Sequence, residues 1–151
     1  MPYFKGSEKY TIDSKGRLKL PARMLRALSS EAEGTFILTF GRGGCVFAYP
    51  KDEWEGIEKK LLAVNQFAEQ DLFFLRRYLM NATELQLDSQ QRLTIPQKYL
   101  KYASIENEVQ ILGVLDHIEF WNPANADTYL FSRGEEEFDD ISEKVMTRKS
   151  T

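Results

Sequence analysis

Two aspartate–arginine pairs with the same spacing are the strongest candidates for functional residues in this chain. Asp13 precedes Arg17 by four residues, and Asp88 precedes Arg92 by the same interval. A guanidinium held by a carboxylate presents its remaining N–H groups in a fixed fork, which matches phosphate oxygens and the major-groove edge of guanine. The spacing therefore favours nucleic-acid binding by Arg17 and Arg92, with Asp13 and Asp88 orienting them.

Both pairs belong to a stretch that occurs twice. Residues 13–21 read DSKGRLKLP and residues 88–96 read DSQQRLTIP, and most positions are identical or exchange one aliphatic residue for another. Such an internal repeat indicates one supersecondary unit built twice. Each copy alone would bury little of its surface, so the two halves are expected to share one core.

Two other interpretations of the pairs follow from the same residues. An exposed hairpin salt bridge would contribute only about 0–1 kcal/mol of stability, and the spacing alone leaves that structural role open. An aspartic-protease pair is disfavoured because Lys15 and Gln90 stand where that family has glycine. An arginine four residues on would also keep each carboxylate ionised, whereas a protease pair shares a proton. No enzyme activity is expected.

Positive charge is concentrated near the N-terminus. Residues 1–30 carry seven Lys or Arg and two acidic residues, a net of +5, and since the whole chain has −3 the other residues carry −8. This separation predicts one basic face on an acidic body. The expected DNA contacts are Lys15, Arg17, Lys19, Arg23, Arg26 and Arg92.

Other site classes have little support in the composition. One Cys and one His are too few for a structural zinc site, so neither a metal nor a cofactor is expected. Cys45 is interpreted as a core residue and His117 as a turn residue. No apolar run is long enough for a membrane helix and no signal peptide begins the chain, so a cytoplasmic protein is expected.

Each pair is expected at the neck of a β-hairpin. Strands over 8–12 and 17–20 would flank Ser14-Lys15-Gly16, whose glycine suits the left-handed position of a three-residue loop. The second copy has Gln90-Gln91 there instead. Because a non-glycine residue in the left-handed region costs about 1–2 kcal/mol, a different turn is expected in the second loop.

The remaining pattern places the same kinds of element in each half. The first half is expected to continue with a helix over 22–28, strands over 35–40 and 45–49, and helices over 52–67 and 69–81. The second half is expected to hold strands over 83–87 and 92–95, a helix over 96–103, strands over 108–114 and 117–121, and a helix after Asn122-Pro123. This order predicts a mainly β fold with packed helices (α+β), a small barrel with the helices outside.

Two helical segments lie outside the repeated motif. Phe73, Phe74 and Tyr78 recur at helical spacing, which is typical of core or of a subunit contact. With Leu72, Leu75 and Leu79 they form a wide apolar face that fits an oligomer interface. The acidic run 135–140 is interpreted as a solvated helix face, with a self-inhibitory tail that imitates phosphate as the alternative.

The first copy, from Asp13 to Arg23, resembles the signature of the MraZ proteins, bacterial relatives of the SpoVT/AbrB DNA-binding domains. The resemblance includes Phe4-Lys5-Gly6, residues 44–50 with Trp54, and residues 84–88, and so covers nearly the whole chain. It implies a double-split β-barrel with pseudo-two-fold symmetry, half of which comes from each repeat. The implied segments are a first SpoVT/AbrB-like repeat (5–54), connecting helices (55–81), a second repeat (82–126), and a C-terminal helix with an acidic tail (127–151).

The resemblance also implies a function. It suggests a sequence-specific transcriptional regulator of the division and cell-wall gene cluster, which binds short direct repeats in double-stranded DNA near its own promoter. A ring-like homo-oligomer associated with the nucleoid is implied as well. Lys15 and Gly16 match the motif in the first copy only, so that copy is expected to contribute more to DNA binding. The alternative is a protein–protein module of the same fold, antitoxin- or adaptor-like, although an adaptor has no need of paired arginines on exposed loops.

Overall fold

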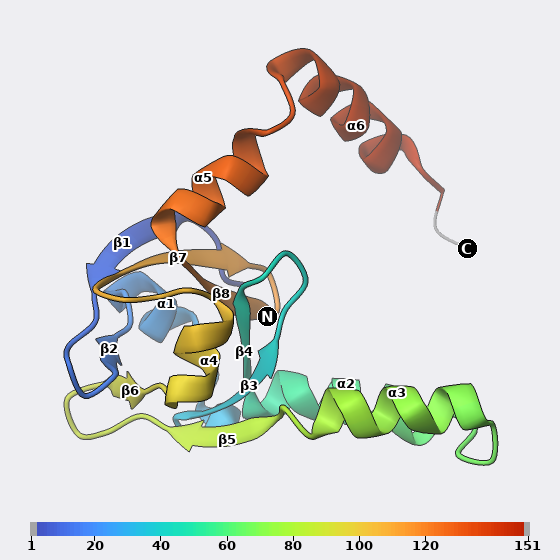
Figure 1. Ribbon diagram of the computed structural model, residues 1–151, viewed down its shortest axis with the longest axis horizontal. Coiled ribbons are helices and arrows are strands. Elements are labelled where there is room, and N and C mark those ends of the chain that lie inside the picture. The colour runs from blue at the N-terminus through green and yellow to red at the C-terminus, as the bar shows by residue number, and fades with distance from the viewer. Residues whose placement is uncertain (1–2, 150–151) are drawn as a thin grey trace.

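Two separate sheets form the centre of the molecule, of which the computed structural model describes residues 3–149 (Figure 1). Six antiparallel strands form one sheet in the order β1-β7-β8-β4-β3-β5, and β2 and β6 form a two-stranded ribbon. The strands are β1 (Ser7–Thr11), β2 (Arg17–Lys19), β3 (Thr35–Phe40), β4 (Val46–Pro50), β5 (Thr83–Gln86), β6 (Arg92–Thr94), β7 (Glu108–Val114) and β8 (His117–Trp121). The helices are α1 (Ala22–Ala27), the 3-10 turn η1 (Ser30–Ala32), α2 (Lys51–Leu62), α3 (Glu69–Leu79), α4 (Gln97–Tyr102), α5 (Pro123–Phe131) and α6 (Glu135–Thr147).

The order of elements repeats as the sequence predicts. Each half runs strand, strand, short helix, strand, strand, helix, and exchanging the two halves leaves the order of strands in both sheets unchanged. The predicted α+β class, mainly sheet with packed helices, is confirmed. Neither sheet closes on itself within residues 3–149, since β1 and β5 are the edges of the larger one, so the structure does not display a closed barrel.

The two halves interlock through strand pairing. β1 of the first half pairs with β7 of the second, β5 of the second pairs with β3 of the first, and β4 pairs with β8. The prediction that β1 and β2 form a hairpin ladder is therefore wrong, because β2 pairs with β6 instead. The loop between β1 and β2 does reverse the chain, but its two flanking strands belong to different sheets.

One apolar core joins the halves. Leu18 and Leu93 from the ribbon are fully buried together with Phe36, Ile111 and Phe120 from the large sheet. Residues of α1 and α4 complete this core. The shared core predicted from the size of each repeat is confirmed, and Cys45 is buried as expected, in a smaller cluster beside α5.

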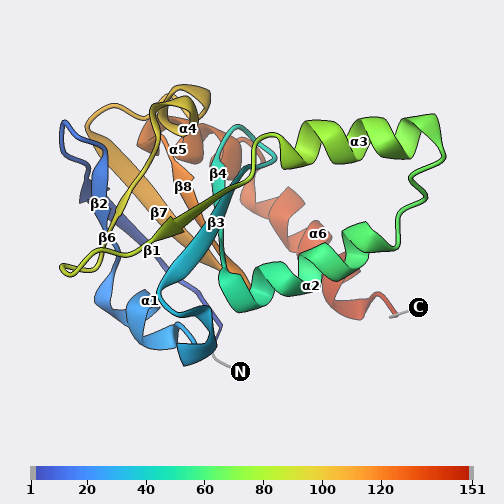
Figure 2. The same cartoon turned by 90° about the horizontal axis from the view of Figure 1, so that it is seen from below.

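Two helical arms leave this centre (Figures 1 and 2). α2 and α3 form an antiparallel hairpin whose base packs on β3 and β4 through Ile37, Tyr49 and Trp54. The predicted helix over 52–67 is too long: α2 ends at Leu62, and Asn65 instead accepts a hydrogen bond from the backbone of Phe67, which stabilises the turn into α3. No helix within residues 3–149 is both long and apolar enough to cross a membrane.

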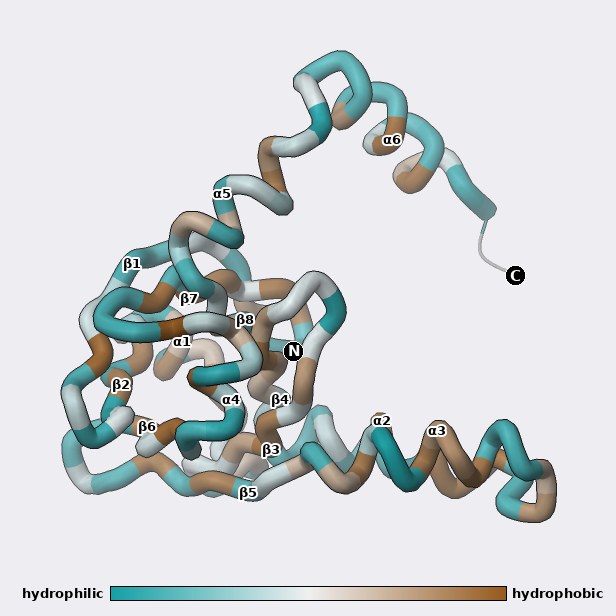
Figure 3. The backbone as a smooth tube through the Cα atoms, in the orientation of Figure 1, coloured by the Kyte–Doolittle hydropathy of each residue, from teal (hydrophilic) through white to brown (hydrophobic). Residues whose placement is uncertain are grey.

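The second arm consists of α5 and α6. α5 begins at an Asn122 cap, with Pro123 in its first turn, and its buried Ala126 packs beside Trp121. α6 confirms that the acidic run is a helix, and it projects away from the sheets with apolar and hydrophilic residues alternating along it (Figure 3). Residues 150 and 151 of the predicted tail lie outside the described part of the chain.

His117 is the first residue of β8 and not a turn residue, so that prediction is wrong. Its Nδ1 lies 2.8 Å from Oδ1 of Asp116 and its Nε2 lies 2.8 Å from Oε2 of Glu119. Trp121 Nε1 donates to the other oxygen of Glu119, over 2.9 Å. Burial alone would lower the pKa of His117, but the hydrogen bonds and negative charges of Glu119 and Asp116 outweigh it and raise that pKa above its usual value.

The raised pKa of His117 predicts a pH dependence of stability. The native state holds this proton more tightly than the unfolded chain, so the stabilisation is fully present below the ordinary pKa, 6.5, and is lost as the pH rises through the raised value. Urea denaturation at a series of pH values should therefore give a falling free energy of unfolding over that window. His117→Gln should flatten the fall, and an identical pH profile for the variant would contradict the prediction.

Candidate nucleic-acid interface

The β2–β6 ribbon carries the predicted site on its outer face. Leu18 lies opposite Leu93 and both point into the core, with no exposed surface. Because side chains alternate along a strand, the neighbours of these leucines point outward. The outward pairs are Arg17 opposite Thr94 and Lys19 opposite Arg92. Three cations from the two halves are thus brought together on one two-stranded surface.

The first loop fixes Arg17 through Asp13. Oδ1 of Asp13 accepts hydrogen bonds from the backbone N–H groups of Lys15 and Arg17, both over 2.9 Å. Oδ2 accepts one from Arg17 Nε over 2.7 Å. Within residues 3–149, Nε is the only side-chain atom of Arg17 in a hydrogen bond or ion pair, so the Nη end of the guanidinium is available to a ligand.

The second loop has the same geometry. Oδ1 of Asp88 accepts from the backbones of Gln90 and Arg92 over 2.8 and 3.0 Å, and Oδ2 accepts from Arg92 Nε over 2.9 Å. The different turn predicted here is wrong. Gln91 adopts φ 62°, close to the 80° of Gly16, because the bonds to Asp88 and the pairing of β6 hold the residue in the left-handed region.

Gly16 should tolerate substitution less well than its counterpart Gln91. A Cβ at Gly16 would lie 2.8 Å from the carbonyl oxygen of Ile95, at a φ of +80°. Gly16→Ala is therefore expected to lower the free energy of unfolding by about 1–3 kcal/mol, from left-handed strain plus the contact with backbone. Thermal denaturation measures the change, with Gln91→Ala as the matched control. A Gly16→Ala protein as stable as the control would contradict the assigned turn.

Both carboxylates are ionised at neutral pH. The backbone N–H of Arg17 is the main cause that lowers the pKa of Asp13, and the Arg17 side chain adds to it. The N–H of Arg92 has the same effect on the pKa of Asp88. Asp13 is exposed and Asp88 is half-buried, and because such solvent-accessible pairs contribute little to stability, the pairs orient the arginines more than they stabilise the fold.

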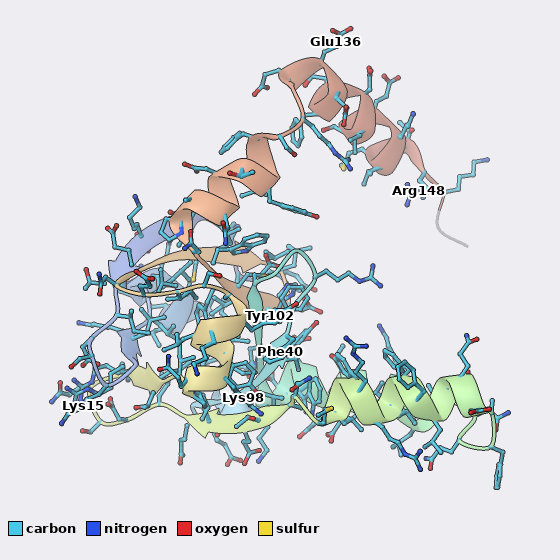
Figure 4. All side chains as sticks on the ribbon, in the orientation of Figure 1. Lys15, Phe40, Lys98, Tyr102, Glu136 and Arg148 are labelled. Atoms are coloured by element: carbon cyan, nitrogen blue, oxygen red, sulfur yellow. The ribbon has the colours of Figure 1, made fainter. Side chains whose placement is uncertain are left out.

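The other residues predicted to contact DNA lie at different distances from the ribbon. Lys15 lies on the loop before β2, at the edge of the molecule (Figure 4). Arg23 and Arg26 lie on α1 and are exposed, and Arg23 is 3.8 Å from Glu8 of β1. The structure therefore groups Lys15, Lys19 and the two arginines, and places the α1 cations outside the ribbon.

Sequence reasoning missed Thr94. It occupies the position of Lys19 in the second copy and lies on the outward face opposite Arg17. The alternation of residues 92–95 was a sufficient signal for its orientation. Within the described part of the chain, no three His, Cys, Asp or Glu side chains are grouped so that they could hold a metal ion.

Comparison with known proteins places this architecture in a family. The family model described as "MraZ protein, putative antitoxin-like" matches twice, over residues 3–77 and 78–149. The chain belongs to the MraZ family. The two matches divide it at the same repeat that the motif and the strand order display, so the chain holds two tandem MraZ domains.

Two relatives extend this likeness over nearly the whole chain. A protein of Halothermothrix orenii named transcriptional regulator MraZ is 36% identical over 139 residues, which is 92% of this chain and 94% of the relative. A protein of the same name from Pelotomaculum thermopropionicum is 35% identical over 143 residues, 95% of each chain. The MraZ resemblance predicted from the motif is confirmed, and these relatives are named as regulators, not as enzymes.

Proposed function

We propose that the chain is a sequence-specific DNA-binding transcriptional regulator that uses the β2–β6 ribbon. The observation that carries the proposal is the outward row of Arg17, Lys19 and Arg92, with both arginines held at Nε by carboxylates. The names of the two relatives that match over nearly the whole chain support the same function.

The ribbon suits the DNA major groove in size and chemistry. A two-stranded β-ribbon fits this groove, and the free end of a guanidinium matches either guanine or phosphate. Arg17 and Arg92 are proposed to read base edges or phosphates, and Lys15 and Lys19 to bind phosphates. Arg23 and Arg26 are proposed to support binding from α1, and Asp13 and Asp88 to orient the arginines.

The two halves of the ribbon differ in charge, and the difference favours the first. Lys15 and Lys19 of the first copy correspond to Gln90 and Thr94 of the second. A pseudo-symmetric ribbon with one basic half would bind DNA in a preferred direction. Short direct repeats, which also have a direction, are the proposed target.

Finer features of the proposal rest on the family resemblance. We take the two sheets and their shared core as a double-split β-barrel, with repeats at 5–54 and 82–126, connecting helices at 55–81 and a C-terminal segment at 127–151. The targets are proposed to include the protein's own promoter and the division and cell-wall gene cluster. A ring-like homo-oligomer in the cytoplasm, associated with the nucleoid, would bind several repeats at once and so gain affinity through effective concentration.

DNA titration tests the proposal. A labelled duplex from the upstream region of the protein's own gene should bind more tightly than a duplex of the same length with shuffled sequence. Specific sites are typically bound about 10³–10⁷ times more tightly than non-specific DNA. Equal and weak binding of both duplexes would reject the proposal and favour an antitoxin-like protein–protein module.

A further inference from the structure

Helix α6 has an apolar stripe that the described part of the chain leaves largely exposed, although Phe138 and Ile141 line a hollow beside α5. Phe138, Ile141, Val145 and Met146 follow helical spacing and lie on one face. Phe138 and Met146 expose 62% and 83% of their surface. None of the residues of α6, all of which the structure describes, is buried. A helix with such a stripe normally packs against another surface.

A groove on the α2–α3 arm is lined by aromatic side chains and suits an apolar helix stripe. Phe40, Phe74 and Tyr78 line two adjoining hollows of about 320 and 370 Å³, and Phe73 and Tyr102 extend the first of them. Phe40 and Tyr102 stack with their rings 4.1 Å apart and so form part of its floor. Phe73 and Phe74 remain 61% and 48% exposed. We call this surface the aromatic groove.

The charges of helix and groove are opposite. Arg77 lines one hollow, Arg42 and Lys60 line the other, and no acidic side chain among the described residues lines either. α6 has six acidic residues against one basic residue within Glu135–Thr147. Glu135 and Asp139 flank its apolar stripe on one side, since three or four residues make one turn of a helix. The acidic amphipathic helix and the basic-rimmed aromatic groove are therefore complementary in charge, and both are apolar at their centre.

We propose that α6 of one copy lies in the aromatic groove of a neighbouring copy, with Phe138, Ile141 and Val145 against the aromatic side chains. The proposal builds on the homo-oligomer of the proposed function and names the surfaces that join its copies. In Figure 1 α6 and the α2–α3 arm of one chain are separate projections, so α6 does not fill its own groove. A helix-in-groove contact of this type uses anchors spaced as in this stripe.

The contact has a geometric consequence. Each copy would offer α6 to one neighbour and its groove to another, which is a head-to-tail interface. Such an interface generates a closed ring when its rotation closes. The acidic run 135–140 then contributes to assembly and is not only a solvated helix face.

Cross-linking between engineered cysteines tests the contact. One full-length protein carries Ser142→Cys, within the stripe of α6, and a second of distinguishable mass carries Asn81→Cys, which lines the groove. Glu136→Cys, on the opposite face of α6, is the matched control. The native Cys45 is fully buried and burial raises the pKa of its thiol, so it will not react with a short bis-maleimide.

The expected result is a two-chain product from the Ser142→Cys and Asn81→Cys proteins, at a yield about tenfold above that of the control pair, as proximity within a complex predicts. Equal yields with the control, or no two-chain product, would overturn the proposal. A chain that carries both cysteines and cross-links only within itself would also overturn it, because α6 would then fold onto its own groove.

A second variant separates this inference from DNA binding. Phe138→Ser should lower the native mass measured by light scattering, whereas Glu136→Ser should not, and both should keep the wild-type circular dichroism. Binding of a duplex with a single site should survive in Phe138→Ser, because the ribbon is untouched. An unchanged native mass of the Phe138→Ser protein would reject the helix contact. Failure of the wild-type protein to bind the DNA duplex would instead reject the proposed function and leave the helix contact untouched.

Discussion

Replacing Arg17 with alanine is expected to weaken binding of a one-site DNA duplex by about 5- to 150-fold, the equivalent of one good guanidinium contact. Arg17 contributes a free Nη end on the ribbon, and Asp13 holds it in one orientation by the 2.7 Å bond at Nε. Alanine removes that end and leaves the oriented carboxylate, which repels phosphate. The loss should appear as a higher Kd in fluorescence anisotropy.

Arg17→Ala should leave the fold intact, since the pair is exposed and such pairs contribute only about 0–1 kcal/mol. Lys59→Ala is the matched control, because it removes one exposed positive charge from α2, away from the ribbon. Arg92→Ala should weaken binding less than Arg17→Ala, because its half of the ribbon has fewer cations. If Arg17→Ala binds as tightly as Lys59→Ala, the ribbon is not the DNA site.

Leu93→Ala is expected to lower the free energy of unfolding by about 2–5 kcal/mol, the range for a buried leucine whose cavity does not collapse. Leu93 is fully buried opposite Leu18, between the ribbon and the large sheet. Urea denaturation at a fixed protein concentration measures the change, since assembly would make stability depend on concentration. Leu62→Ala is the control, because Leu62 is 76% exposed.

The same experiment tests whether the halves fold as one unit. β1 pairs with β7 and β5 pairs with β3, so neither half retains its sheet without the other. Leu93→Ala, in the second half, should therefore shift a single transition that includes the tryptophans of both halves, Trp54 and Trp121. Two separate transitions, or a change no larger than that of Leu62→Ala, would contradict the shared core.

The sequence predicted those parts of the site that depend on neighbours along the chain. The four-residue spacing placed each aspartate beside its arginine, and alternation placed Leu18 inward and Arg17 outward. It did not predict that β2 and β6 pair with each other, because nothing local specifies a partner 75 residues away. Only this pairing puts Lys19 opposite Arg92 and brings the two motifs onto one surface.

Predictions based on local residue preferences are wrong where tertiary contacts outweigh those preferences. The left-handed preference of glycine predicted a new turn at Gln91, yet the bonds to Asp88 impose the same turn as in the first copy. The local sequence Leu115-Asp116-His117-Ile118 predicts a turn residue, yet His117 begins β8, where the carboxylates of Asp116 and Glu119 contact its ring. The double-split β-barrel implied by the family resemblance is not displayed by the sheet order alone.

The salt dependence of DNA binding tests the central claim most directly. If Lys15, Arg17, Lys19 and Arg92 engage three or four phosphates, a plot of log K against log salt concentration should have a slope of about −3 to −4 for a one-site duplex. The double variant Lys15→Ala/Lys19→Ala should flatten the slope by about 2, since each phosphate contact contributes nearly one. A slope near zero in the wild type, or the same slope in the double variant, would contradict the assignment of the β2–β6 ribbon as the DNA-binding surface.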